Sequence, residues 1–309
     1  MLTLKEHTVQ EQVLVDAPAD ALRRVVADLE YWVQVHRPAA HAEYLDRGEE
    51  DVIRHWAVVD DHTVRTWTER RRTGADRISF ALEAPEDPNP DARGAWTFET
   101  RPGGTLVTLR YEFSVPENDT ENTVALVRAD VAEQLATVEY AGKARDELAD
   151  LIISFEDPLF VAGSLEDAYA YLYEADKWAE RIPHVSRLVL EEDTPNIQFF
   201  DMDTATADGR AHTTRSVRVC LPGDKIVYKQ IRLPALLDAH TGHWLFTASP
   251  EGVVASARHT ATIKPSALHL LGEGTTVLDA RKYLRRVLSE NSMGNLRLTK
   301  AYAEQRAGL

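Results

Sequence analysis

Apolar residues recur at helical spacing in two short and two long segments of the chain. Ala19–Leu29 carries its apolar side chains on one face, and Pro18 stands just before it, as is common at the start of a helix. We predict a second short helix near Leu165–Glu174 and long helices over Asn122–Ser154 and Val277–Arg306. Each half of the chain therefore ends on a long helix.

Between the short and the long helices, the pattern is typical of β-strands separated by turn residues. The strands predicted in the first half are Glu11–Val15, Ala42–Leu45, Val52–Val59, Thr63–Arg72, Asp76–Glu83, Ala95–Thr100 and Thr105–Val115. In the second half, strands are predicted from about Ser186 to Lys264. This is an α+β arrangement, in which a curved antiparallel sheet buries its concave face against the long helix. We expect a small-molecule cavity between sheet and helix in each half.

An internal repeat relates the two halves. Three pairs of residues recur at a nearly constant shift: Trp32 and Trp178 at 146 residues, and Trp96 and Trp244, and Gly104 and Gly252, at 148 residues. A period of this length indicates a domain duplication and not a solenoid. We predict domains over residues 1–154 and 155–309, joined by a linker around Phe155–Pro158.

Charge and cysteine content narrow the class of protein. Asp and Glu number 50 against 35 Lys and Arg, for a net charge of -15, which disfavours nucleic acid and anionic membrane surfaces. No apolar run is long enough to span a membrane, and the N-terminus does not resemble a signal peptide. The single cysteine, Cys220, excludes an intramolecular disulfide. We expect a cytoplasmic protein.

The order of strand, short helices, meander and long helix resembles the helix-grip fold of the START/polyketide cyclase superfamily. Two tandem copies in 309 residues resemble the di-domain aromatase/cyclases of bacterial type II polyketide synthases. The resemblance covers essentially the whole chain. It is carried by Trp32 and Trp178, by VRTWTERRR at Val64–Arg72, by TRSVR at Thr214–Arg218, by PALLDAHTGHW at Pro234–Trp244, and by the strands around Trp96 and Trp244. It implies two helix-grip (START/Bet v-like) domains.

Single-domain cyclases of this family carry Trp, Ser and Arg at alternate positions of one strand, and alternation points all three to one face. In the first half, the matching residues are Trp67, Glu69 and Arg71. The resemblance makes Trp67 a substrate contact and Arg71 a catalytic candidate. Glu replaces Ser, so Glu69 is expected at the same face, where it could neutralise Arg71.

In the second half, the matching strand places His212, Thr214, Ser216 and Arg218 on one face, with Thr where the family has Trp. An arginine suits oxyanion stabilisation, and a serine or histidine can relay protons. The resemblance therefore implies catalytic roles for Arg218 and Ser216, with His240 as an acid/base or substrate contact. We favour the second half for the chemistry because it keeps the Ser–Arg pair.

The remaining candidates have two readings. Trp32, Trp96, Trp178 and Trp244 are expected substrate contacts if they line the cavities, and core residues otherwise. His240 and His243, with His212 or His259, could form a metal site, but they lack the second-shell acids and helix placement of typical zinc sites.

The resemblance implies an enzyme that directs aldol cyclisation between the seventh and twelfth carbons of a ketoreduced poly-β-ketone chain on an acyl carrier protein, followed by dehydration and aromatisation. This chemistry needs neither a metal nor a redox cofactor. Two alternatives stand beside it: a carrier of hydrophobic ligands, and a synthase subunit that shields the chain. Because carrier proteins are usually acidic, docking would need a basic patch, for which Arg23–Arg24 and Arg281–Arg286 are candidates.

Overall fold

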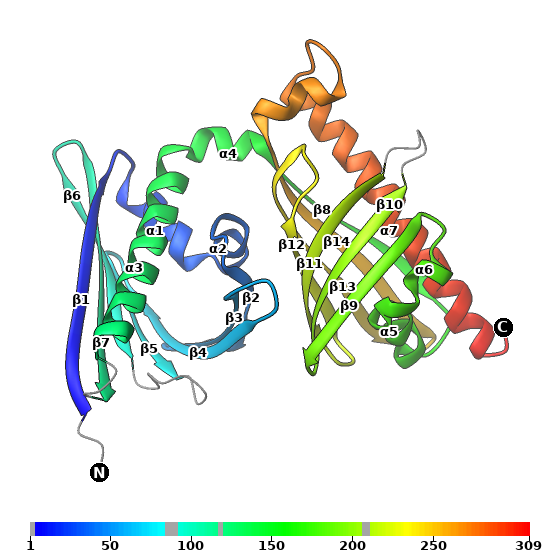
Figure 1. The fold of residues 1–309 in the computed structure, drawn as a ribbon, viewed down its shortest axis with the longest axis horizontal. Helices are drawn as coiled ribbons and strands as arrows, with labels where there is room; N and C mark the ends of the chain where they lie inside the picture. The colour runs from blue at the N-terminus through cyan, green and yellow to red at the C-terminus, as the bar shows by residue number, and fades with distance from the viewer. Residues whose placement is uncertain (1–3, 84–91, 117–119, 206–210) are drawn as a thin grey trace. The chain divides into compact units, whose positions relative to one another are not determined.

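The computed structural model describes residues 4–83, 92–116, 120–205 and 211–309, which form two compact units (Figure 1). Unit 1 comprises residues 1–59 and 64–147, and unit 2 comprises residues 60–63 and 148–309. The boundary expected after residue 154 falls inside strand β8 (Ile152–Val161). The linker predicted at Phe155–Pro158 is wrong, because these residues pair with β14 (Gly252–Ile263). Pro158 is tolerated there because β8 is an edge strand.

Unit 1 is a seven-stranded antiparallel sheet with a long helix against it (Figure 1). Its strands run in the order β1-β7-β6-β5-β4-β3-β2, and α3 packs on β1 and β7. The strands are β1 (Leu4–Val15), β2 (Ala39–Asp46), β3 (Asp51–Val58), β4 (Val64–Thr73), β5 (Arg77–Glu83), β6 (Arg93–Arg101) and β7 (Gly104–Pro116). The helices are α1 (Ala19–Ala27), α2 (Leu29–Val35), α3 (Thr120–Lys143) and α4 (Arg145–Leu151).

Unit 2 repeats this plan, with the strand order β8-β14-β13-β12-β11-β10-β9 and α7 packed on β8 and β14. Its further strands are β9 (Val185–Thr194), β10 (Ile197–Ala205), β11 (Ala211–Leu221), β12 (Lys225–Arg232) and β13 (Leu237–Ser249). Its α-helices are α5 (Leu165–Tyr173), α6 (Trp178–Arg181) and α7 (Val277–Arg306), and short 3-10 turns span Ala175–Lys177 and Pro265–Leu271. The predicted α+β fold of two helix-grip domains is confirmed.

The helix at the C-terminus matches its predicted bounds, whereas the long helix of the first half does not. A capping box between Thr276 and Asp279 sets the start of α7. The helix predicted over Asn122–Ser154 ends at Lys143, a separate helix follows to Leu151, and the next residues begin β8. The spacing of apolar residues does not reveal where the helix ends, because apolar residues continue from the helix into β8, whose inner side is also apolar.

The short helix predicted over Ala19–Leu29 is divided in the structure. The side chain of Asp28 accepts a hydrogen bond from the backbone N–H of Tyr31 at 3.0 Å, and so begins a second helix, α2. The first predicted strand starts earlier than expected, at Leu4, because β1 pairs with β7 along its whole length.

In each sheet, alternate side chains face the long helix, and we call this side the inner face. In β7 the inner positions Val107, Leu109 and Phe113 are buried, and they share the interior with Val131 and Val138 of α3. In unit 2, one apolar cluster joins β13 and β14 to α7. The inner faces thus form two separate cores.

Gly104 and Gly252 explain one pair of the repeat. Their φ angles are 137° and 153°, a region that side chains disfavour. An added Cβ would lie 2.1 Å from the carbonyl oxygen of Val15 at Gly104, and 2.2 Å from that of Val161 at Gly252. Each glycine lets the turn before the last strand approach the end of the first strand.

We predict opposite effects for two glycine substitutions inside the long helices. A Cβ at Gly142 of α3 would lie 2.3 Å from Leu22 Cδ2, so Gly142→Ala should lower the free energy of unfolding by about 1–3 kcal/mol. A Cβ at Gly294 of α7 meets no atom within 4 Å, so Gly294→Ala should raise it by up to about 1 kcal/mol. Urea denaturation measures both, and equal effects would contradict the packing described here.

Candidate functional site

The two arginines expected to be catalytic lie on the inner faces and bind the carboxyl ends of the short helices. Arg71 Nη1 donates to the carbonyl of Val26 at 3.0 Å. Arg218 donates from Nη1 to the carbonyl of Leu172 at 2.8 Å, and from Nη2 to that of Tyr173 at 2.7 Å. Carbonyls in the last turn of a helix lack partners within the helix and carry partial negative charge. Each arginine supplies both a donor and a positive charge.

Each arginine also uses further donors. Arg218 binds the Gln198 side-chain oxygen through Nε at 3.0 Å and also through Nη2, and it lies over the rings of Trp178 and Phe200. Arg218 is 1% exposed, and burial lowers its pKa. Arg71 binds both carboxylate oxygens of Glu69, at 2.7 and 2.8 Å. The geometry favours a capping role for both arginines over the expected oxyanion role.

Glu69 is the centre of a buried ionic group in unit 1. Its carboxylate contacts His55 Nε2 at 2.7 Å, and the His55 ring stacks on Trp67 at 5.1 Å between centroids. Burial alone would raise the pKa of Glu69, but the charge of Arg71 and the contacts with His55 hold it at about 2. Glu69 is thus a permanent carboxylate that occupies the donors of Arg71.

A second polar group of unit 1 joins α3 to the sheet. The Gln134 side-chain amide donates to the Tyr111 hydroxyl at 3.3 Å and to Asp130 Oδ2 at 3.0 Å. Burial raises the pKa of both Asp130 and Tyr111. Asp130 is therefore a candidate for proton exchange in this half, and it was not among the residues expected from the sequence.

Unit 2 contains a hydrogen-bonded chain of polar side chains on three adjacent strands, of which His240 and His259 are buried. His240 Nδ1 lies 2.9 Å from Gln230 Oε1, and His240 Nε2 lies 3.1 Å from His259 Nδ1. The Tyr228 hydroxyl lies 2.7 Å from the same His259 nitrogen and donates to the carbonyl of Arg258 at 3.3 Å. All of these side chains point to the inner face.

Donor and acceptor matching sets the protons along this chain. Gln230 Oε1 can only accept, so His240 carries its proton on Nδ1 and accepts at Nε2. With the Tyr228 hydroxyl donating to the Arg258 carbonyl, all of these contacts are satisfied when His259 carries its proton on Nδ1, which leaves Nε2 as a bare lone pair. His259 Nε2 is buried and has no hydrogen-bond partner among the residues that the structure describes. The arrangement presents one unprotonated nitrogen to the interior of unit 2.

Burial keeps both imidazoles neutral near pH 7. It lowers the pKa of His240 to about 4. For His259, burial is again the main cause, and neighbouring positive groups add to it, so its pKa lies well below the usual value. A neutral imidazole retains the lone pair that a general base requires.

Further polar atoms in the same interior lack partners. Thr214 Oγ1 and Asn295 Oδ1 are buried and unpaired among the described residues. A buried polar atom without a partner costs about 1–3 kcal/mol, so such groups mark places where a ligand can supply the missing bond. The buried side of α7 also carries Ser292 and Thr299, whereas that of α3 is mostly apolar apart from Thr123. The hydroxyls of Ser292 and Thr299 add to the polar groups in the interior of unit 2.

The other expected residues divide between this interior and the apolar cores. Ser216 is buried on the inner face of β11, next to Gln230 in the register of β12. Trp96, Trp178 and Trp244 are buried core residues. Trp32 and Trp67 are half-buried, and Trp32 stacks on His36 at 4.5 Å. The side chain of His212 lies outside the described residues.

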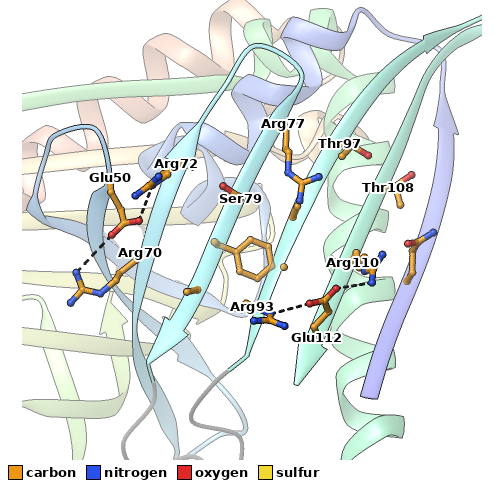
Figure 2. A pocket seen from close by; sticks show the side chains of 15 residues that line it. Glu50, Arg70, Arg72, Arg77, Ser79, Arg93, Thr97, Thr108, Arg110 and Glu112 are labelled. Atoms are coloured by element: carbon orange, nitrogen blue, oxygen red, sulfur yellow. Dashed lines mark hydrogen bonds and ion pairs between the residues drawn. The ribbon is translucent and has the colours of Figure 1, made fainter. Parts of the chain in front are cut away.

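Two pockets of the described residues lie outside the interiors of the two units. One, of about 520 Å³, lies on the outer face of β4–β7 (Figure 2). Another, of about 590 Å³, follows α7 from Leu278 to Glu290. Neither of these two lies between a sheet and its helix.

No three His, Cys, Asp or Glu side chains gather in the described part of the chain as a metal ion would require. None of the helices described is both long and apolar enough to cross a membrane.

From the sequence, His259 was expected only as one ligand of a possible metal site. A signal for its role exists in β14, where the inner positions read Ala255, Ala257, His259 and Ala261. A lone polar side chain in a row of alanines on a buried face needs a partner or a function.

Comparisons with known proteins place the chain in a family. Residues 6–140 match the model of "Polyketide cyclase / dehydrase and lipid transport". The actinorhodin polyketide synthase bifunctional cyclase/dehydratase of Streptomyces coelicolor is 37% identical, over 96% of this chain and 97% of the relative. The chain belongs to the polyketide cyclase/dehydrase family.

Members with solved structures share the two-domain plan. The di-domain ARO/CYC StfQ of the steffimycin pathway is 56% identical with a TM-score of 0.90, over 97% of this chain and 100% of that chain. The di-domain ARO/CYC BexL of the BE-7585A pathway is 35% identical with a TM-score of 0.84, over 96% and 99%. The prediction of a polyketide cyclase/aromatase of the di-domain type is confirmed at the level of the family.

For this cyclase/dehydrase, we expect Arg218→Ala to act first on stability. The change leaves the Leu172 carbonyl and the Gln198 oxygen without these donors in a buried site, at a cost of about 1–3 kcal/mol for each group, while the Tyr173 carbonyl keeps a donor in Gln198 Nε2. Urea denaturation at pH 7 measures the loss, with exposed Arg24→Ala as the control. If the Arg218→Ala protein unfolds like the wild type but lacks activity, that result would support the oxyanion role expected from the sequence and contradict the capping role.

The buried histidines predict a loss of stability in acid. The pKa of His240 is about 4 in the folded state against about 6.5 unfolded, so the unfolded chain binds more protons between these values. The free energy of unfolding should fall as the pH drops from about 6.5 to about 4, by on the order of 3 kcal/mol. His240→Gln should flatten this dependence, and the exposed His269→Gln should leave it unchanged. An equal slope in all three proteins would refute the assignment.

Proposed function

We propose that this protein directs the first-ring aldol cyclisation of a ketoreduced poly-β-ketone chain and its dehydration, within the cytoplasm, while an acyl carrier protein holds the chain. The proposed ring joins the seventh and twelfth carbons. We place the chemistry in the interior of unit 2. The observation that carries this placement is the bare Nε2 of His259 at the end of the hydrogen-bonded chain from Gln230.

In the proposed cyclisation, His259 Nε2 removes a proton from the carbon between two carbonyls of the chain. The resulting enolate carbon forms a bond to a ketone carbon further along, and that ketone oxygen becomes an alkoxide. The proton held by His259 then passes to the alkoxide. When His259 becomes an imidazolium, its Nδ1–H donates to His240, whose own Nδ1–H donates to Gln230. These linked hydrogen bonds polarise one another and stabilise the positive charge.

Dehydration uses the same nitrogen. His259 removes a second proton from the carbon next to the new hydroxyl, and the hydroxyl leaves as water once it is protonated. The hydroxyl of the reduced position leaves in the same way, and aromaticity favours both losses. Protons removed from carbon equal those delivered to oxygen, so no oxidant or reductant takes part.

The unpaired hydroxyl of Thr214 and the neighbouring Ser216 support this placement. Both lie on the inner face of β11, where a hydroxyl can donate to an enolate or carbonyl oxygen. Arg218, two residues further, positions the carboxyl end of α5 against this strand. In this proposal Arg218 is a positioning residue, and Arg71 has the same role in unit 1.

A reconstituted type II synthase that makes a reduced chain tests the proposal. We expect His259→Gln to lower the yield of the aromatised first ring about 100-fold, since a general base contributes about that much or more. Shunt products should replace it, because an unguided poly-β-ketone cyclises spontaneously. Carbon-13 labelling of the chain identifies which carbons the ring joins.

Asp130→Asn is the matched change in unit 1 and should leave first-ring formation near the wild-type level. Loss of the ring in Asp130→Asn but not in His259→Gln would place the reaction in unit 1. If neither variant changes the product while both remain folded, the protein shields the chain and does not act as its base.

A further inference from the structure

The pocket on the outer face of unit 1 has a floor of small side chains and a rim of arginines (Figure 2). In the register of β4 to β7, Arg72 pairs with Ser79, Ser79 with Ala95, and Ala95 with Arg110. This row therefore reads arginine, small, small, arginine across four strands, which spans roughly 14 Å. The hollow exists because long side chains flank short ones.

The arginines surround the floor. Figure 2 shows Arg70 and Arg72 on one side, Arg110 on the opposite side, and Arg77 and Arg93 at the two ends. They come from four neighbouring strands, and their side chains are on the solvent side of the sheet, opposite the buried Glu69 and Arg71.

Carboxylates hold four of these arginines in place without neutralising the group. Glu50 lies 3.0 Å from Arg72 and 4.0 Å from Arg70, and Glu112 lies 2.9 Å from Arg93 and 2.6 Å from Arg110.

The positive charge is still in excess. Glu83 pairs with Arg70 from outside the lining, so five arginines face three carboxylates. Arg77 forms no ion pair within the described part of the chain. This local surplus lies on a chain whose net charge is -15.

We propose that this pocket binds a phosphate-bearing ligand. A carboxylate is planar and is satisfied by one or two arginines, as Glu50 and Glu112 already are. A phosphate presents several oxygens in different directions, and here guanidinium groups approach from several sides above the Ser79 hydroxyl. Thr97 and Thr108 add two hydroxyls at the end near Arg77.

The existing ion pairs do not block such a ligand. The side chains of Arg72 and Arg93 are 69% and 70% exposed, and exposed ion pairs contribute at most about 1 kcal/mol. A phosphate can therefore replace or share these contacts at small cost. The inference stands apart from the proposed cyclisation, because it involves the outer face of unit 1 and none of the residues assigned to the reaction.

Calorimetric titration of the full chain with inorganic pyrophosphate tests the site. We expect saturable binding that weakens as salt is raised from 50 to 200 mM. The double variant Arg77→Ala/Arg93→Ala should weaken binding about tenfold or more, and its exposed positions should leave the melting temperature unchanged. Arg101→Ala removes an exposed arginine of β6 that pairs with Glu99, outside the pocket, and serves as the control. Ser79→Val fills the floor without changing charge and should also weaken binding.

Two sources of phosphate share this chemistry: a free phosphorylated small molecule, and the phosphopantetheine tether of a carrier protein. Coenzyme A against pantetheine tests the first, and carrier protein with and without its tether tests the second. Binding that requires the phosphate in either comparison supports the site. The proposal would be overturned if pyrophosphate does not bind, whether or not the two carrier forms bind equally. It would also be overturned if pyrophosphate binds equally well to Arg77→Ala/Arg93→Ala.

Discussion

In each half of this protein, a buried arginine of the sheet binds the carboxyl end of a short helix. The interaction joins elements that are 45 or 46 residues apart along the chain, Val26 to Arg71 and Leu172 to Arg218. A guanidinium can do this because its fixed fork offers several donors to carbonyls that the helix itself leaves unpaired. The helix direction, and with it the end of the sheet that the helix covers, depends on this contact.

The duplicated framework is filled differently in the two halves. In unit 1, Arg71 is balanced by the charged Glu69, whereas Arg218 in unit 2 is bound only by neutral groups. Phe80 and Tyr111 contact each other on the inner face of unit 1 at 4.9 Å between ring centroids. The positions 148 residues later are Tyr228 and His259, which form part of the hydrogen-bonded chain. At these two positions, an aromatic contact of unit 1 is therefore replaced in unit 2 by a hydrogen-bonded pair of side chains.

The two faces of the first sheet are also chemically distinct. The alternation of β4 sends Glu69 and Arg71 inward, where they pair with each other, and sends Arg70 and Arg72 outward, where they meet solvent. Consecutive arginines in one strand thus have unrelated roles. Inside, the charge is compensated and organises the fold. Outside, it is in excess and accessible, as a binding site for an anion requires.

The sequence by itself determined the duplication, the α+β class, most strands and the bounds of α7, because alternation, helical periodicity and capping are local signals. Together with the family resemblance, alternation also predicted that Arg71 and Arg218 lie on inner faces, although for Arg218 the sequence left an exposed position open. Only the tertiary structure decided where the first long helix ends, since Ile152–Ser154 become a strand by pairing with Thr260–Thr262. It alone brought Gln230, His240 and His259 into one chain, and it showed that the donors of Arg218 are already bound. Hydrogen bonds between distant segments depend on how strands are placed, and no local pattern records which donors are used.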